Sequence, residues 1–171
     1  LGLNLAIFFK KNLEVILLLN KRKVKPTFAN TISLKNYKVE TVKSIIEKES
    51  PDFVLHCAAI TDVDYCENNK EVTYKINTEF PEVVAKAMKS NSEKYYIIQI
   101  STDQIYNGKG PHLENAPNPI NEYSRSKFEI EKKLIKYNSI CLRTNFFGKS
   151  EHATKLSFSD KIYNSCINKS N

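Results

Sequence analysis

Two side chains capable of acid-base chemistry stand one helical turn apart in the segment NEYSRSKFEIEKKL, residues 121–134. Tyr123 and Lys127 are four positions apart, so on a helix they share a face. A free tyrosine, with a pKa of about 10, exchanges protons poorly near neutrality, but a neighbouring ammonium charge favours the phenolate. Tyr123 could therefore donate a proton while Lys127 tunes its acidity. The alternative is a surface helix in which Lys127 is solvated and the ring of Tyr123 packs beneath it.

The elements that must position this pair alternate between strands and helices. Four short apolar runs rich in β-branched and aromatic residues punctuate the chain, at 14–19, 53–59, 95–101 and 139–144. Their continuous hydrophobicity predicts strands buried on both faces, and segments 39–50 and 81–90 between them have helical periodicity. The order predicts an α/β fold, a Rossmann-like doubly wound parallel sheet.

Polar segments follow two of the predicted strands. AITDVD comes after the second run and STDQIYNG after the third, and both are rich in hydroxyl and carboxylate side chains. In open parallel sheets ligands bind outside the carboxyl ends of the strands. The helix that carries Tyr123 begins beside the same edge, so the sequence predicts a binding site there.

Length and composition narrow the class of protein. A chain of 171 residues can form one core, or one core and the beginning of another, and its hydrophobic fraction of 41% is that of a folded globular protein. The formal charge of +7 comes from scattered lysines rather than from basic residues interleaved with stacking aromatics, so no nucleic-acid partner is expected. No apolar run reaches the roughly eighteen residues that span a bilayer, so no membrane partner is expected either.

The four cysteines predict neither disulfides nor a metal site. Cys57, Cys66, Cys141 and Cys166 form no C-x-x-C pair and have no histidine at ligand spacing. Cys57 and Cys141 lie in apolar runs, where a reduced cysteine behaves as a small hydrophobic residue. This usage indicates a reducing, cytoplasmic location.

The two ends of the chain predict an incomplete fold. Residues 1–12 have the pattern of an amphipathic helix that runs directly into a strand, with no strand before it. We expect the first strand and most of a phosphate-binding loop to be missing, with Gly2 as the last glycine of that loop. The predicted domains are 1–148, a truncated nucleotide-binding domain, and 149–171, the incomplete start of a substrate-binding lobe.

Five motifs carry a resemblance to a known family: HCAAITDVDYCE, INTEFP, ISTDQIYNG, PNPINEYSRSK and LRTNFFG. In order and spacing they resemble the extended short-chain dehydrogenases/reductases, most of all the dTDP-4-dehydrorhamnose reductase branch. The resemblance implies a Rossmann-like fold and NAD(P)H-dependent reduction of a 4-keto-6-deoxy sugar nucleotide. It further implies a place in dTDP-rhamnose and lipopolysaccharide precursor synthesis, and it is compatible with a homodimer.

The resemblance implies a role for each residue near the predicted site. Tyr123 would donate the proton, Lys127 would tune it and hold the nicotinamide ribose, and Thr102 would hydrogen-bond the reacting carbonyl. Asp103 and Phe146 would contact the sugar nucleotide. Simpler alternatives are a strand-end cap for Thr102, a turn for Asp103 and a core aromatic for Phe146.

Further residues would contact the cofactor by the same resemblance. Together with Tyr123 and Lys127 they are Gly2, Asn20, Lys21, Arg22, Ser33, Leu34, Cys57, Ala58, Ala59 and Asn77. Small side chains at 57–59 would let the cofactor approach closely; the simpler alternative is a tight strand end. Asn77 would also support the catalytic loop; the simpler alternative is a polar residue at the start of a helix.

The residues after the first predicted strand bear on cofactor choice. Lys21 and Arg22 stand where an acidic residue would favour NAD, so NADP(H) is favoured and NAD(H) remains open. A solvated basic turn is the simpler alternative. Ser33 replaces an Asp that many family members place beside the adenine, which weakens that contact.

Three functions remain in competition. The first is the reductase, and the second is another nucleotide-sugar epimerase or dehydratase of the superfamily, although Asp103 lacks the acidic neighbour usual in dehydratases. The third is a non-catalytic NAD(P)-binding subunit similar to the regulatory partner of methionine adenosyltransferase. An intact Thr102, Tyr123 and Lys127 favours an enzyme, while the truncated ends predict that the 171 residues alone bind NADPH poorly and turn over little.

Overall fold

The protein is described by a computed structural model that covers residues 1–20, 26–89, 96–149 and 156–168. The chain forms two compact units, one of Leu34–Thr144 and one of Leu1–Ser33 with Asn145–Asn171. The domains expected at 1–148 and 149–171 remain a prediction.

A three-stranded parallel sheet organises the unit of Leu34–Thr144. Its strands β3 (Phe53–His56), β4 (Tyr96–Ile100) and β5 (Ser139–Leu142) pair in the order β3-β4-β5. The register aligns His56 with Gln99 and Gln99 with Cys141. Because the strands are parallel, their carboxyl ends meet at one edge, as the sequence predicted.

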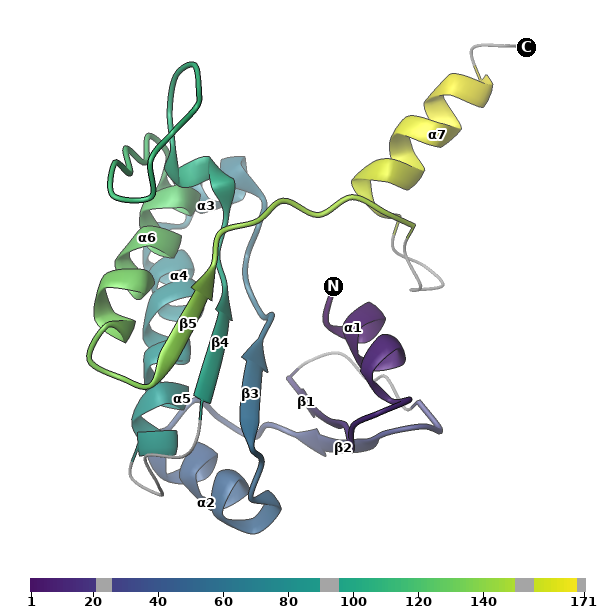
Figure 1. Ribbon diagram of the computed structural model, residues 1–171, viewed down its shortest axis with the longest axis vertical. Coiled ribbons are helices and arrows are strands. Elements are labelled where there is room, and N and C mark those ends of the chain that lie inside the picture. The colour runs from purple at the N-terminus through teal and green to yellow at the C-terminus, as the bar shows by residue number, and fades with distance from the viewer. Residues whose placement is uncertain (21–25, 90–95, 150–155, 169–171) are drawn as a thin grey trace. The chain divides into compact units, whose positions relative to one another are not determined.

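Helices cover one face of this sheet (Figure 1). They are α2 (Val39–Glu49), α3 (Val63–Asn68), α4 (Lys70–Tyr74), the π-helix η1 (Lys75–Glu79), α5 (Phe80–Lys89) and α6 (Glu122–Leu134), with a 3-10 turn η2 (Asp103–Ile105) after β4. The core joins the apolar sides of α2, α5 and α6 to the strands and includes Val42, Val84, Ile97 and Ile130. Burial of these apolar faces is the main force that holds the helices to the sheet.

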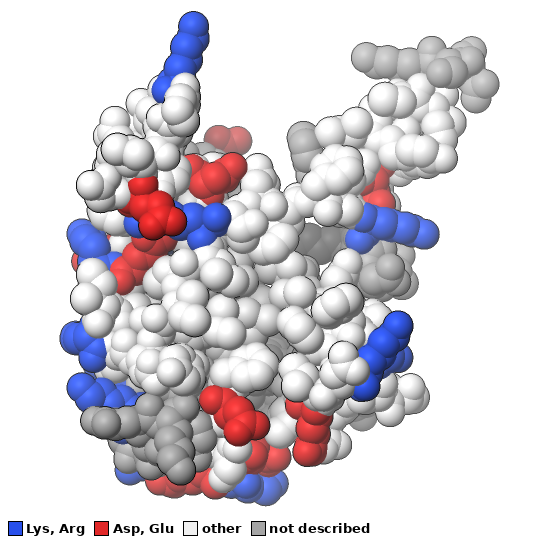
Figure 2. Space-filling model, in the orientation of Figure 1, with Lys and Arg blue, Asp and Glu red and all other residues white. Residues whose placement is uncertain are grey.

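We expected these strands to be buried on both faces, but the face opposite the helices is partly exposed. Phe53, Tyr96, Ile140 and Leu142 are between 38% and 48% exposed. In the view of Figure 2, the surface over these strands is largely free of charged side chains. The described helices of this unit pack on one face only, which is why apolar side chains remain exposed on the other.

The second unit contains a separate two-stranded parallel sheet. Strand β1 (Ile16–Leu19) follows helix α1 (Gly2–Phe9) and pairs with β2 (Asn30–Ser33), and helix α7 (Phe158–Asn168) belongs to the same unit. The α/β class with parallel strands is confirmed, but the described strands form two sheets rather than the single sheet expected. Within the described ranges, no helix is both long and apolar enough to cross a membrane.

Candidate active site

Helix α6 begins at a fixed point because its first residues form a capping box. The side-chain oxygen of Asn121 accepts a hydrogen bond from the Ser124 amide at 2.8 Å, and the Ser124 hydroxyl accepts one from the Asn121 amide at 3.3 Å. The negative charge of Glu122 in the first turn interacts favourably with the positive end of the helix dipole. Tyr123 therefore lies in a well-anchored first turn.

The buried face of α6 includes polar and charged side chains. Tyr123, Lys127, Ile130, Glu131 and Leu134 are all buried, at the spacing of one helical stripe. Lys127 is only 2% exposed and Glu131 7%. Because Lys127 is buried rather than exposed to solvent, the alternative of a surface helix with a solvated Lys127 is wrong.

Tyr123 meets Thr102 at the carboxyl end of β4. Both residues are buried, and the Thr102 side chain lies close enough to the phenol to affect its pKa. Burial raises the pKa of Tyr123 above its ordinary value of 10.0, and the neighbouring Thr102 side chain opposes part of that rise. The net shift is opposite to the lowering that we expected from the charge of Lys127. A raised pKa keeps the phenol protonated at neutral pH, as a proton donor requires.

Thr102 also has the capping role considered from the sequence. Its hydroxyl oxygen accepts a hydrogen bond from the Gln104 amide at 3.2 Å and so caps the 3-10 turn η2. Asp103, the first residue of that turn, is exposed. The same hydroxyl donates a hydrogen bond to a carboxylate oxygen of Asp103 at 3.4 Å, so it acts as acceptor and donor at once.

Lys127 has a pKa close to physiological pH. Burial lowers its pKa from 10.5 to about 8. The nearby Cys141, Glu131 and Cys57 oppose that change. The ammonium form therefore predominates at pH 7 and is lost above about pH 8.

Asn77 holds the loop that follows β3. Its side-chain amide accepts a hydrogen bond from the Ile60 amide at 2.8 Å and donates one to the Ile60 carbonyl at 2.9 Å. It donates another to the Ser126 hydroxyl of α6 at 3.1 Å. Asn77 lies in the π-helix η1, a rare conformation often found at functional sites. These contacts are those of a residue that supports the loop.

We predict that Asn77→Ala destabilises the protein by about 2–3 kcal/mol, because the partly buried Ile60 amide would lose its partner and the Ile60 carbonyl would be left with the weak Cys66 thiol donor at 3.7 Å. Urea unfolding of the variant and the parent measures the loss. Asn68→Ala is the matched control, since Asn68 is exposed and donates to the Asp64 carbonyl within its own helix. Equal losses in the two variants would show that Asn77 has no special supporting role.

Glu67 is a further contact that sequence reasoning missed. One of its carboxylate oxygens accepts a hydrogen bond from the Glu122 amide at 2.6 Å and lies 3.6 Å from Arg125. The carboxylate of α3 thus binds the first turn of α6, beside Tyr123. Glu67 ends the motif HCAAITDVDYCE, but only the packing of α3 on α6 gives it this role.

The remaining predicted cofactor residues of this unit follow β3 or lie in the core. Cys57 and Ala59 are half-buried and Ala58 is exposed. Burial raises the pKa of the Cys57 thiol. Leu34 is buried among the core side chains rather than displayed at the surface.

His56, just before Cys57, is the least expected buried group. It is 5% exposed, and of the hydrogen bonds among the described residues none reaches either ring nitrogen. Burial lowers its pKa from 6.5 to about 3, so the ring is neutral. It packs against Phe80, with ring centroids 5.4 Å apart.

Four predicted residues belong to the other unit. Gly2 begins α1, Asn20 follows β1 and is exposed, Ser33 ends β2 and is exposed, and Phe146 is 49% exposed. Lys21 and Arg22 lie outside the described residues, so the preference for NADP(H) that they suggested remains a prediction.

Comparison with known proteins identifies the family. Residues 1–161 match the family described as RmlD substrate binding domain. The chain belongs to the RmlD substrate binding domain family. Among RmlD-like relatives, the Escherichia coli K12 dTDP-4-dehydrorhamnose reductase is 36% identical over 123 residues, which cover 68% of this chain and 39% of that protein. A crystal structure of a hypothetical dTDP-4-dehydrorhamnose reductase from Sulfolobus tokodaii has a TM-score of 0.73 at 34% identity. The match covers 83% of this chain and 50% of that one.

A relative of another kind also matches this RmlD-family chain. The zebrafish methionine adenosyltransferase 2 subunit beta is 32% identical over 100 residues, 57% of this chain and 30% of that protein. The chain thus spans between 30% and 39% of the two curated relatives described here. The resemblance inferred from the five motifs is confirmed at the level of family and fold.

Proposed function

We propose that the natural gene product is an NAD(P)H-dependent reductase of a nucleotide-linked 4-keto-6-deoxy sugar. The observation that carries the proposal is the burial of Tyr123 near Thr102, with buried Lys127 one helical turn away. The same three residue types were selected from the sequence for this chemistry. Identity of 36% with the E. coli dTDP-4-dehydrorhamnose reductase supports the substrate class.

In the proposed reaction, residues at the end of β4 and the start of α6 stabilise and protonate the carbonyl oxygen. As the carbonyl is reduced, negative charge develops on its oxygen. Thr102 donates a hydrogen bond to that oxygen, and Tyr123 transfers its hydroxyl proton to it, leaving a phenolate. The positive charge of Lys127 stabilises that phenolate, because opposite charges attract strongly in a poorly solvated site.

A nicotinamide cofactor fits the donor set beside this pair. The Lys127 ammonium could donate to ribose hydroxyls, and the small side chains of Ala58 and Ala59 leave room for a close approach. When bound, the reduced nicotinamide would supply the hydride. In this scheme Cys57, Ala58 and Ala59 line the approach, while Asn77 holds the loop that carries them.

A non-catalytic role as a nucleotide-binding subunit is the second candidate. It is favoured by the 32% identity with the zebrafish methionine adenosyltransferase subunit. The two candidates differ in turnover rather than in cofactor binding. An epimerase of the same superfamily would invert one carbon of the sugar, and a dehydratase would remove water from it, both with no net consumption of NADPH.

We predict that the natural gene product oxidises NADPH when given a dTDP-linked 4-keto-6-deoxyhexose. The rate should fall as pH rises through about 8, because Lys127 loses its charge there. Nicotinamide absorbance measures turnover, after intact mass and N-terminal sequence have defined the natural product. NADH in place of NADPH, and the free keto sugar without its nucleotide, are the controls. Binding of NADPH without turnover would favour the subunit role instead.

A further inference from the structure

Glu131 is a buried carboxylate that the proposed reaction does not use. It lies one helical turn after Lys127 on the buried face of α6 and is 7% exposed. A buried charge is strongly unfavourable unless partners satisfy it. The partners of Glu131 therefore indicate what its burial achieves.

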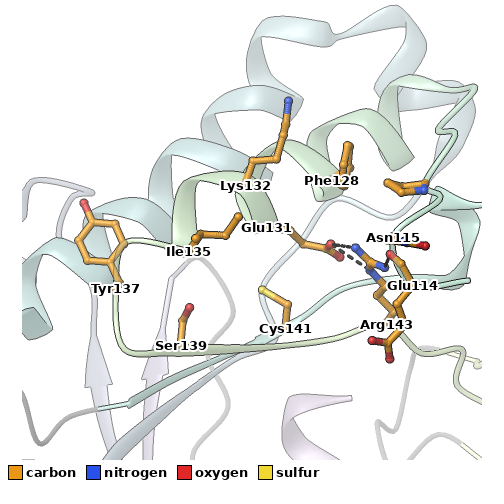
Figure 3. Close-up of a pocket in the computed structure, with 11 residues that line it drawn as sticks. Glu114, Asn115, Phe128, Glu131, Lys132, Ile135, Tyr137, Ser139, Cys141 and Arg143 are labelled. Carbon is orange, nitrogen blue, oxygen red and sulfur yellow. Dashed lines mark hydrogen bonds and ion pairs between the residues drawn. The ribbon is translucent and has the colours of Figure 1, made fainter.

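The carboxylate of Glu131 joins the carboxyl ends of two strands to the helix. One oxygen accepts a hydrogen bond from the hydroxyl of Ser101, directly after β4. The other accepts bonds from Nε and Nη2 of Arg143 at 3.0 and 2.7 Å, directly after β5. Figure 3 shows the Arg143 guanidinium facing this carboxylate.

Arg143 extends the same network to the loop after β4. Its Nη1 donates to the Tyr106 hydroxyl at 2.6 Å and to the Glu114 carbonyl at 2.5 Å. The Tyr106 ring in turn stacks on His112, with ring centroids 5.2 Å apart. The loop that leaves the candidate site is thus tied to Glu131 through one guanidinium.

Two consecutive residues after β4 lie beside two positions on α6. Ser101 donates a hydrogen bond to Glu131, and buried Thr102 lies near buried Tyr123, about two helical turns earlier. The Cα atoms of consecutive residues are held about 3.8 Å apart, so a shift of Ser101 displaces Thr102 as well. Loss of the bond between Ser101 and Glu131 should therefore change the placement of Thr102 beside Tyr123.

We propose that Glu131 is a positioning residue, whose bonds to Ser101 and Arg143 hold the β4 end against α6 and keep Thr102 aligned with Tyr123. The inference rests on the proposed function, since it assigns that alignment to the reaction. Groups held within a fraction of an ångström by a surrounding network react faster than loosely held ones.

Nuclear magnetic resonance of tyrosine labelled at the ring carbon that bears the hydroxyl tests the alignment without any substrate. The Tyr123 signal is assigned as the one lost in Tyr123→Phe. Its displacement in Thr102→Ala defines the signal of a Tyr123 without the Thr102 hydroxyl beside it. We expect Glu131→Gln to displace the Tyr123 signal in the same direction, by about half as much or more.

Glu129→Gln is the matched control, because it makes the same change of charge on the same helix. Its carboxylate is 39% exposed and pairs with Lys132. The Tyr123 signal should stay in place in this variant. An equally unmoved signal in Glu131→Gln would overturn the positioning role.

A second variant keeps the proposal testable if Glu131→Gln does not fold. Ser101→Ala removes only the hydroxyl that links β4 to Glu131, so it should displace the Tyr123 signal as well. No displacement in folded Ser101→Ala would then overturn the proposal. Since this readout requires no turnover, a gene product without reductase activity would refute the proposed function and leave the alignment result intact.

Discussion

Replacing Tyr123 with Phe should lower the reductase rate of the natural gene product by about 10³-fold, within the range that general acid catalysis supplies. The substitution removes one oxygen atom and with it the transferable proton. The ring still fills its buried place, so the fold and the cofactor contacts of Lys127 should remain. We therefore expect the dissociation constant for NADPH to change by less than about twofold.

The measurement for Tyr123→Phe is kcat with saturating substrate, together with NADPH binding by calorimetry. Tyr96→Phe is a suitable control, since Tyr96 begins β4 but is 45% exposed. Losses of similar size in rate and in cofactor affinity would contradict a proton-donor role. They would indicate that Tyr123 serves mainly to bind the cofactor.

Replacing Lys127 with Met should increase stability while it abolishes most of the activity. The pKa of Lys127 falls from 10.5 to about 8 in the folded protein because its ammonium is buried. A difference of this size corresponds to about 3 kcal/mol of unfavourable free energy for the charged form. Methionine fills a similar volume without a charge, so the variant should be more stable near neutral pH. The rate should fall by about a hundredfold or more, because the phenolate of Tyr123 would lose its nearby cation.

The pH dependence of this stability gain has a definite sign. Below pH 8 both folded and unfolded chains hold the Lys127 proton, and the parent bears the full cost of a buried charge. Between about pH 8 and 10.5 only the unfolded parent binds the proton, so its free energy of unfolding rises with pH. The advantage of Lys127→Met should be largest below pH 8 and should vanish toward pH 10.5.

Urea unfolding at several pH values measures this difference between variant and parent. Lys48→Met provides the control, because the Lys48 side chain is 82% exposed and its removal leaves no buried charge. A Lys127→Met protein less stable than the parent at neutral pH would contradict the account. It would mean that the ammonium has stabilising partners that outweigh its burial.

The regular elements near the site could be predicted because their patterns are long and clear. The apolar runs at 53–59, 95–101 and 139–144 became β3, β4 and β5, and the segment at 39–50 became α2. Strand β2 was missed because its sequence, NTIS, is short and mostly polar, and three of its four residues are exposed. Hydrophobic periodicity cannot indicate a strand with so few apolar residues.

The sequence pointed to the residues that we propose to react but not to the residues that support them. Tyr123 and Lys127 were found from spacing within one helix, and Thr102 from its place after a strand and from the family motif. Glu131 and Glu67 were missed because their partners come from other elements, which only the packed structure brings together. Glu131 did carry a signal, its position four residues after Lys127 on the same face.

The direction of the Tyr123 pKa could not be obtained from spacing either. A lysine one turn away suggested a lowered value, but the burial of Tyr123 in the folded chain has the larger effect. Burial depends on the helices and strands around the ring, and a motif contains no information about them. The raised value nevertheless suits a proton donor in the reductive direction.

Transfer of deuterium from labelled cofactor to sugar tests whether the protein is a reductase with Tyr123 as its proton donor. The natural gene product would be incubated with NADPH carrying deuterium in place of each transferable hydrogen of the nicotinamide ring, and with a dTDP-linked 4-keto-6-deoxyhexose. We expect a product alcohol with one deuterium at carbon 4, formed by the parent and almost absent with Tyr123→Phe. A sugar nucleotide recovered unreduced, from a gene product that binds NADPH and the sugar nucleotide, would contradict the proposed function.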